Sequence, residues 1–261
     1  MTRPREVDGF PGLRVLRAEN PSPLTLDGTR THIVGLERCV VVDPGSADDR
    51  HLDGLDEALA EAVEVTIALT HDHPDHAAGA FGLAGRLAAR GVAVAALGVA
   101  AGTLEEGDVL DADAGRLVAL ATPGHTRDHV AFHWPGAGAV FCGDLMMGGL
   151  DTALVAPPEG HLGDYLASLD RLARLRPRAI FPAHGPPFTT SPEGAMATYV
   201  EHRRARLAQV REALAEGLEE PDAIVTRVYG DALPPGLRAA ATAALHAYLD
   251  HLTQIEGGGA E

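Results

Sequence analysis

The chain has 261 residues, enough for one large domain or for one domain with an appendix. Hydrophobic residues make up 46% of it, which supports a full core, and the formal net charge of −16 would repel a polyanion on average. Two cysteines are too few for a disulfide framework, the N-terminus shows no signal-peptide pattern, and no apolar run reaches the roughly 18 residues of a membrane span. We therefore expect a cytoplasmic protein without membrane contact.

The predicted elements alternate between short apolar strands and helices, which is typical of an α/β fold. The expected strands cover residues 13–16, 31–36, 39–42, 65–70, 92–97, 109–110, 117–122, 130–134, 139–142 and 178–181. The expected helices cover about residues 48–63, the small-residue segment from 77 to 90, and an amphipathic stretch over 162–175.

One short stretch carries most of the chemical information. His71-Asp72-His73-Pro74-Asp75-His76 follows directly on the apolar strand 65–70. On extended backbone His71 and His73 point the same way, and Pro74 suits the first position of a helix that re-aims Asp75 and His76. Imidazole and carboxylate are ligands that zinc and neighbouring transition metals prefer. The stretch therefore predicts a metal site.

Further ligand-type residues lie just past the ends of other strands. His125, Asp144 and His184 each follow an apolar run, as His71 does, and we expect all four at one edge of a sheet. Asp43 follows strand 39–42 and is either a turn residue or a carboxylate that orients a metal-binding histidine. The sequence leaves both interpretations open.

Helical periodicity dominates the C-terminal part. We expect a main α/β domain over residues 1–194 and a small helical domain over 195–261, with helices from about 196 to 216, 221 to 229 and 237 to 255. This part has more acidic than basic residues, which does not favour nucleic-acid binding.

These motifs resemble a known family. His-x-His-x-Asp-His, Thr-Pro-Gly-His-Thr at 122–126, Gly-Asp at 143–144 and Ala-His-Gly at 183–185 are similar to the motifs of the metallo-β-lactamase superfamily. The stretches 20–29, 42–45 and 199–203 resemble the β-lactamase-like protein 2 group, whose members carry a C-terminal winged-helix-type domain. The resemblance implies a four-layer αβ/βα sandwich with a small winged-helix-like appendix.

The resemblance also implies a binuclear metal centre. One metal would take His71, His73 and His125, the other Asp75, His76 and His184, with Asp144 bridging the two. Two divalent ions are expected, zinc first, with manganese or iron suiting the same ligands.

The expected function is a dinuclear zinc-dependent hydrolase that uses a metal-bridging hydroxide on a small ester or thioester. Asp75 is the candidate catalytic residue, because it would hold a metal and steer the hydroxide. The alternative is an endoribonuclease acting on single-stranded RNA; a non-catalytic binding module is disfavoured by the complete ligand set. A homodimer is left open.

Substrate-binding candidates come from a departure from the family pattern. Members usually continue Gly-Thr-Asn-Thr-Tyr, whereas this chain has Arg30 and His32 at the third and fifth of those positions. We therefore expect Arg30 and His32 to contact the substrate.

Overall fold

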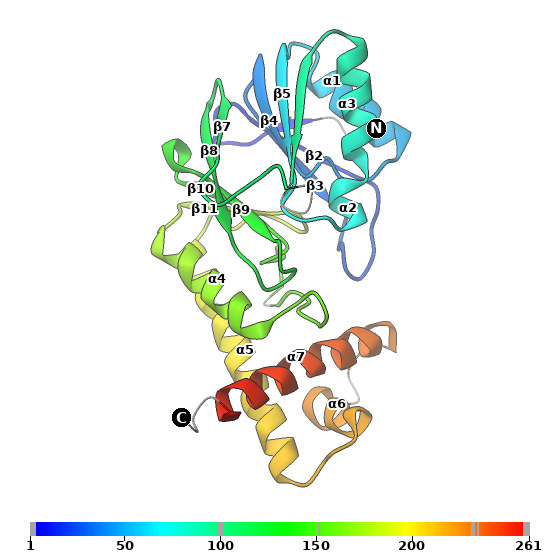
Figure 1. The fold of residues 1–261 in the computed structure, drawn as a ribbon, viewed down its shortest axis with the longest axis vertical. Coiled ribbons are helices and arrows are strands. Elements are labelled where there is room, and N and C mark those ends of the chain that lie inside the picture. Colours follow the sequence, from blue (N-terminus) through cyan, green and yellow to red (C-terminus); the bar gives the residue numbers. More distant parts are fainter. Residues whose placement is uncertain (1–3, 99–101, 151, 231–232, 234, 258–261) are drawn as a thin grey trace.

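The computed structural model describes residues 4–98, 102–150, 152–230, 233 and 235–257. Its upper part in Figure 1 holds two mixed β-sheets, and its lower part holds the C-terminal helices. The first sheet has the strand order β1-β2-β3-β4-β5-β6, antiparallel from β1 to β4 and parallel from β4 to β6. Its strands are β1 (Arg5–Glu6), β2 (Leu13–Arg17), β3 (Arg30–Val34), β4 (Arg38–Val42), β5 (Glu64–Ala68) and β6 (Ala93–Leu97).

The second sheet has the order β11-β10-β9-β8-β7. Its strands are β7 (Val109–Ala112), β8 (Gly115–Ala121), β9 (Val130–Trp134), β10 (Ala139–Gly143) and β11 (Ala179–Pro182). Strand β10 runs parallel to β11, and the other neighbours are antiparallel. It follows that β8, β10 and β11 all end at the same edge.

Helices cover the outer faces of both sheets (Figure 1). Those of the first half are α1 (Asp49–Ala58), α2 (Pro74–Ala77) and α3 (Gly79–Ala89), and α4 (Leu162–Arg174) follows β10. The C-terminal helices are α5 (Pro192–Ala215), α6 (Pro221–Tyr229) and α7 (Arg238–Gly257), and short 3₁₀ turns cover Pro135–Ala137 and Pro235–Leu237. Within the described residues, no helix combines the length and apolar character that a membrane span needs.

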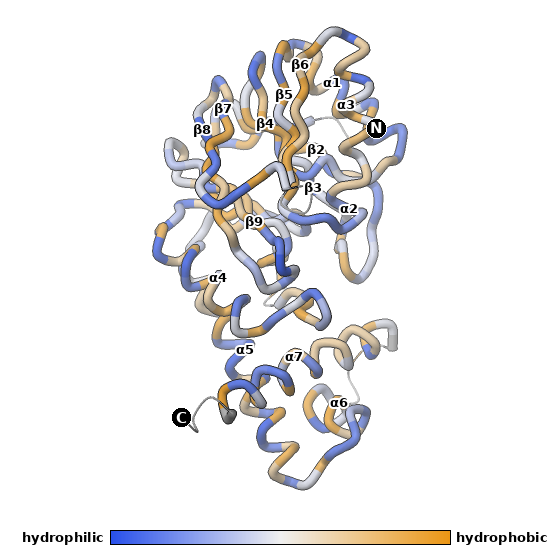
Figure 2. Tube along the Cα trace, in the orientation of Figure 1, coloured by the Kyte–Doolittle hydropathy of each residue, from blue (hydrophilic) through white to orange (hydrophobic). Residues whose placement is uncertain are grey.

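Three apolar clusters lie between the four layers, which are helices, first sheet, second sheet and helices. The side chains of β4 alternate between two of these clusters. Cys39 and Val41 face α1 and α3, whereas Val40 and Val42 pack between the two sheets with Phe132 and Phe141 of the second sheet. Side chains that alternate along a strand serve two cores in this way. The third cluster joins the far face of the second sheet to α4 and the C-terminal helices. Figure 2 shows the apolar character of β5 and β6. The four-layer α/β sandwich expected from the sequence is confirmed.

The predicted elements agree closely with the observed ones, with small differences at their ends. Helix α1 stops at Ala58 rather than near residue 63, because the backbone N–H of Val63 is already bonded to the Glu37 carbonyl, 2.7 Å away, on the approach to β5. Strand β1 has only two residues and was not predicted; no apolar pattern marks it.

The C-terminal region is helical, as expected. A winged helix adds a β-hairpin to its helices, and the described residues from 192 to 257 contain α5, α6 and α7 but no strand. The helices share one apolar cluster with α4 and β10, including Met196, Val210 and Leu245. The region is therefore packed onto the sandwich.

Candidate metal centre

The ligand-type residues predicted from the sequence converge where strands end. His71 follows β5, His125 follows β8, Asp144 directly follows β10, and His184 lies two residues after β11. The two sheets meet at this edge, since the Val130 N–H donates to the Thr70 carbonyl over 2.8 Å. Helix α2 begins at Pro74, as predicted, and turns Asp75 and His76 back toward the same point.

Three imidazoles form the first group. His73 Nδ1 lies 2.9 Å from His71 Nε2 and 3.2 Å from His125 Nε2. Two ligand atoms bound to one tetrahedral zinc ion at about 2.0–2.1 Å would lie about 3.3–3.4 Å apart. The three nitrogens therefore lie close to the separation that a shared cation requires.

Two imidazoles and two carboxylates form the second group. His184 Nε2 lies 3.2 Å from Asp75 Oδ2 and 3.3 Å from Asp144 Oδ1, and His76 Nε2 lies 3.5 Å and 3.4 Å from the same two oxygens. The other Asp144 oxygen, Oδ2, lies 3.7 Å from His125 Nε2 in the first group. One carboxylate thus faces both groups, as a bridging ligand would.

Unpaired polar atoms show that this donor set fits metal ions. His76 Nε2, His184 Nε2 and Asp144 Oδ1 are buried and have no hydrogen-bond partner within the described part of the chain. A buried polar atom without a partner is costly, and a cation placed among these three atoms would remove that cost. Imidazole nitrogens with carboxylate oxygens are a suitable set for zinc or iron.

The charges of the site also favour a cation. Burial opposes ionisation of Asp144, but the His76 and His184 imidazoles outweigh it and hold the pKa of this carboxyl well below its usual range. Burial disfavours protonation of His184, yet Asp144 and Asp75 raise its pKa to about 9. The carboxylates thus stabilise positive charge at this point.

Asp43 orients two of the histidines. Its Oδ2 accepts hydrogen bonds from His76 Nδ1 (2.9 Å) and from the Thr70 hydroxyl (2.8 Å), and that hydroxyl in turn accepts from His71 Nδ1 (3.0 Å). With Nδ1 protonated in both rings, both Nε2 lone pairs face the cluster. Of the two interpretations left open, the structure favours the orienting carboxylate, although the φ of 51° at Asp43 shows that this residue also makes the turn.

His73 and His125, the other two ligand candidates of the first group, are each oriented by a hydrogen bond from the ring nitrogen that faces away from the group. His125 Nδ1 donates to the Leu154 carbonyl over 2.7 Å, and His73 Nε2 donates to Glu159 Oε2 over 2.9 Å. His129 belongs to the support of the site, because its Nε2 accepts the backbone N–H of Asp144 over 3.2 Å.

Gly143 is required at the turn before Asp144. Its φ is +49°, and a Cβ at this position would lie 2.6 Å from His129 Nε2 and 2.7 Å from the Thr70 hydroxyl. A side chain there would displace two residues that hold the site. The glycine therefore allows β10 to deliver Asp144 at close range.

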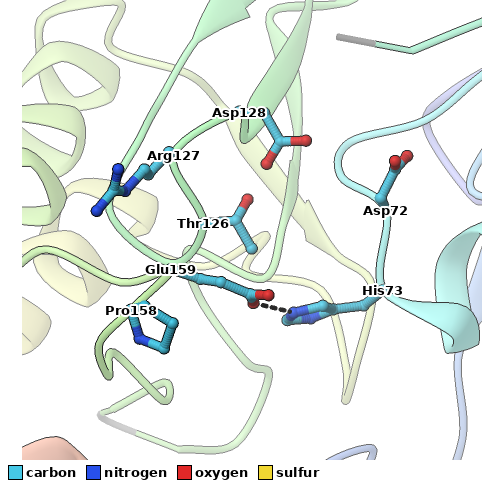
Figure 3. A pocket seen from close by; sticks show the side chains of 7 residues that line it. All are labelled: Asp72, His73, Thr126, Arg127, Asp128, Pro158 and Glu159. Atoms are coloured by element: carbon cyan, nitrogen blue, oxygen red, sulfur yellow. Dashed lines mark hydrogen bonds and ion pairs between the residues drawn. The ribbon is translucent and has the colours of Figure 1, made fainter. Parts of the chain in front are cut away.

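The cluster opens to solvent at two of its members. The His73 and Asp75 side chains are 35% and 28% exposed, whereas those of His76 and His184 are fully buried. Cavities of 390 Å³ and 220 Å³ adjoin His73, and the smaller one also borders His125. Figure 3 shows the Glu159 carboxylate meeting His73 at the larger cavity, with Arg127 turned away from that pair. The cluster is therefore accessible from the side of His73.

The two expected substrate-binding residues are placed differently. His32 is 3% exposed, and its ring packs 5.1 Å from that of Phe141 and 5.8 Å from that of Phe181. The expectation of direct substrate contact is wrong for His32, because β3 turns its side chain into the space between the sheets. Arg30 has its guanidinium paired with Asp27 at 2.8 Å and lies outside the cavities that border the metal cluster.

Sequence reasoning missed two partners of the site, Glu159 and the Leu154 carbonyl. Both lie in the irregular segment between β10 and α4, and Glu159 is 86 residues from the histidine it contacts. No periodicity or motif marks such a residue. Thr70, by contrast, directly precedes His71 and could have been considered.

Comparison with known proteins agrees with this geometry. The family model of the metallo-β-lactamase superfamily matches residues 31–184, which include all seven ligand candidates. The chain belongs to this superfamily of metal-dependent hydrolases. It is 29% identical to a β-lactamase-like protein 2 homologue of Drosophila melanogaster, over 92% of this chain and 86% of the relative.

Solved structures show the same architecture. A β-lactamase domain protein from Burkholderia ambifaria is 26% identical, with a TM-score of 0.77 over 97% of this chain and 88% of that chain. A second structure, described as a di-iron-bound form, is 27% identical, with a TM-score of 0.52 over 70% of this chain and 97% of that chain.

Proposed function

We propose that this protein hydrolyses a small ester or thioester with the help of two divalent cations, zinc being the first candidate. The observation that carries the proposal is Asp144, whose two oxygens face two separate groups of ligand atoms. His71, His73 and His125 would hold one cation; Asp75, His76 and His184 would hold the other, with Asp144 between them. When bound, a pair of cations supplies hydroxide at neutral pH and polarises the oxygen of the bond under attack.

The residues of the chain would prepare the site for this chemistry. Asp43 and Glu159 fix the tautomers of the histidines that they contact, so that no reorganisation is needed during turnover. Asp75 is the most exposed member of the second group, which places its carboxylate to orient an attacking water and accept its proton. The structure offers no cysteine for covalent catalysis among the described residues: Cys39 and Cys142 are buried, and burial raises the pKa of both thiols.

The rim of the site supports a small substrate over RNA. The cavity beside His73 is bordered by three carboxylates, Asp72, Asp128 and Glu159, and by one guanidinium, that of Arg127. Phosphate backbones need a track of cationic side chains, which this rim does not offer.

The ligand candidates suit more than one metal. Imidazole-rich sites bind zinc, iron and manganese. The geometry of the ligands and the availability of each metal in the cell decide which one is bound. One similar structure is described as di-iron-bound, so iron is the second candidate. Elemental analysis of the purified protein, with two equivalents expected, tests this part of the proposal.

The activity test compares substrates in parallel. Zinc-loaded full-length protein would be incubated with a panel of small esters and thioesters and with single-stranded RNA. The Asp75→Asn variant serves as the blank, and Asp111→Asn is the matched control, since Asp111 is exposed on β7, the strand at the opposite end of the sheet from β10 and β11.

Turnover of a thioester or ester, lost in Asp75→Asn but kept in Asp111→Asn, is the expected result. Cleavage of RNA that is lost in the same variant, with the panel untouched, would overturn the small-substrate proposal in favour of an endoribonuclease. Equal turnover by Asp75→Asn would remove Asp75 from the proposed role.

A further inference from the structure

A separate apolar cavity lies between the sandwich and the C-terminal helices. It has a volume of 260 Å³ and is formed by the segment after β10 together with α5, α6 and α7. Its walls are mostly aliphatic, and they include Met147, Leu150, Leu154, Leu237 and Ala244. None of the seven metal-ligand candidates borders it.

Two guanidiniums and one imidazole interrupt this apolar wall. Arg203 and Arg206 of α5 both border the cavity, together with His202. The described residues that line it include no aspartate or glutamate. This is unexpected in a chain with 37 acidic and 21 basic residues.

Among the described residues, neutral groups hold Arg203 in place. It is 3% exposed; one Nη donates to the Tyr248 hydroxyl over 2.9 Å, and the other donates to the Ala153 carbonyl. Its guanidinium stacks 5.0 Å from the ring of Tyr165, and its buried Nε has no hydrogen-bond partner among the described residues. A guanidinium stays charged at any physiological pH, so this site buries a positive charge that neutral groups only partly satisfy.

Arg206 adds a second charge at the same cavity. It donates to the Val228 carbonyl over 2.7 Å and to the Gln209 side chain, and it lies 4.1 Å above the Tyr229 ring. Arginines on other surfaces behave differently: Arg86, Arg171 and Arg227 each pair with a carboxylate. Within the described residues, neither cavity arginine forms an ion pair.

We propose that this cavity binds an apolar carboxylic acid, with the hydrocarbon body against the aliphatic wall and the carboxylate at Arg203 and Arg206. The apolar lining favours a hydrocarbon body. The two guanidiniums have no carboxylate partner among the described residues and favour an anionic head; guanidinium matches the geometry of a carboxylate in particular. The site is distinct from the metal centre, and its test does not depend on turnover.

A thin wall separates the two sites. The Ala153 carbonyl accepts from Arg203, and the next carbonyl along the chain, that of Leu154, accepts from the ligand candidate His125. An acid in the cavity would thus lie one extended segment away from the cluster. Such an acid is also the product class that hydrolysis of an apolar ester or thioester releases.

The test is calorimetric titration of the full-length protein with octanoate and decanoate. Octanol and octylamine carry the same hydrocarbon without the negative charge. Arg206→Gln removes one charge from the cavity, and Arg204→Gln is the matched control, because Arg204 is exposed on the same helix. Ala240→Leu fills the cavity without a change of charge. Thermal unfolding confirms that each variant is folded.

The expected result is one site for the acids, with octanol and octylamine binding at least about tenfold more weakly, since a charge-assisted hydrogen bond contributes about 1.5–3 kcal/mol. Arg206→Gln and Ala240→Leu should each weaken binding by about the same factor, and Arg204→Gln should not. Equal affinity for octanol, an unchanged affinity in Arg206→Gln, or no binding of either acid at millimolar concentration would overturn the proposal.

Discussion

The edge that carries the seven ligand candidates, called here the metal edge, and the C-terminal cavity favour charges of opposite sign. At the metal edge, imidazoles and carboxylates face one another, and the carboxylates of Asp43 and Glu159 orient His76 and His73. At the cavity, cationic side chains are held by a carbonyl, a hydroxyl and aromatic rings, with no carboxylate among the described lining residues. The first arrangement favours a cation, and the second favours an anion.

The difference shows how function is divided along the chain. The metal edge is built at strand ends of the two sheets, whose positions are set by backbone ladders and a close-packed core. The cavity depends on how α5 and α7 pack against Met147, Leu150 and residues 152–154. The edge therefore defines the type of reaction, and we expect the helical region to define which apolar molecules the protein binds.

The largest effect is expected at the residue that joins the two ligand groups. Asp144→Asn replaces an oxygen that faces His76 and His184, or the one that faces His125, by an amide nitrogen without a free lone pair. Loss of a group that only orients a metal ligand lowers activity about 10–100-fold, and loss of Asp144 should lower it further. The variant should also bind one metal equivalent instead of two. Elemental analysis and turnover of the best panel substrate measure this. Full metal content in the variant would contradict the bridging assignment.

The convergence of the seven ligand candidates could be predicted from the sequence because each of them lies in a short local pattern. His71 to His76 form one motif, and the other ligands follow strands whose apolar runs are easy to recognise. The prediction failed at His32 for a physical reason. Neighbouring residues of β3 point to opposite faces of the sheet, so a shift of one residue exchanges the two faces. The hydrophobic pattern of β3 did not show that His32 faces Phe141 and Phe181. Arg203 could not be placed either, because its environment comes from Ala153 and Tyr248, which lie far away in the sequence.

His32 extends the comparison to an imidazole inside the sandwich. Burial, with a contribution from Arg30, lowers its pKa from 6.5 to about 3. Below pH 6.5 the unfolded chain binds a proton at this ring that the folded chain does not bind until about pH 3, so stability is lost as the pH falls through this window. Between pH 7 and pH 4 the loss from this group should be roughly 2–3 kcal/mol.

The measurement is urea unfolding of the wild type and of His32→Phe at both pH values. Other titrating groups are common to the two proteins, so the difference isolates His32. Turnover of the best panel substrate at neutral pH should be unchanged in the variant, because the ring does not reach the cavities. If the free energy of unfolding fell equally in the wild type and in His32→Phe between pH 7 and pH 4, His32 would not be a buried neutral imidazole.

Asp43→Asn tests the support of the metal edge. The amide keeps one acceptor but presents an NH₂ group to a second donor, either that of Thr70 or that of His76. Metal affinity should fall about 10–100-fold. Competition with a chromophoric chelator measures it, and Asp111→Asn should behave as the wild type. An affinity within twofold of the wild type would mean that Asp43 serves only the turn.

Tyr199→Phe tests the border between the two regions. The Tyr199 hydroxyl accepts the Met147 N–H over 2.7 Å and donates to the Met147 carbonyl over 2.8 Å, which ties α5 to the loop that follows Asp144. Its removal leaves two buried backbone groups without this partner, so the free energy of unfolding should fall by about 1–2 kcal/mol. Tyr229→Phe is the matched control, because no hydrogen bond of the Tyr229 hydroxyl is present within the described residues, and it should change stability less.

Metal affinity should change little in Tyr199→Phe. Asp144 is held independently by its backbone bond to His129, and the Tyr165 hydroxyl still donates to the Leu145 carbonyl over 2.6 Å. Denaturant unfolding and chelator competition on the same preparation separate the two effects. If metal affinity fell as far as in Asp43→Asn, the helical region would be part of the ligand support, and the division between the metal edge and the C-terminal cavity would no longer hold.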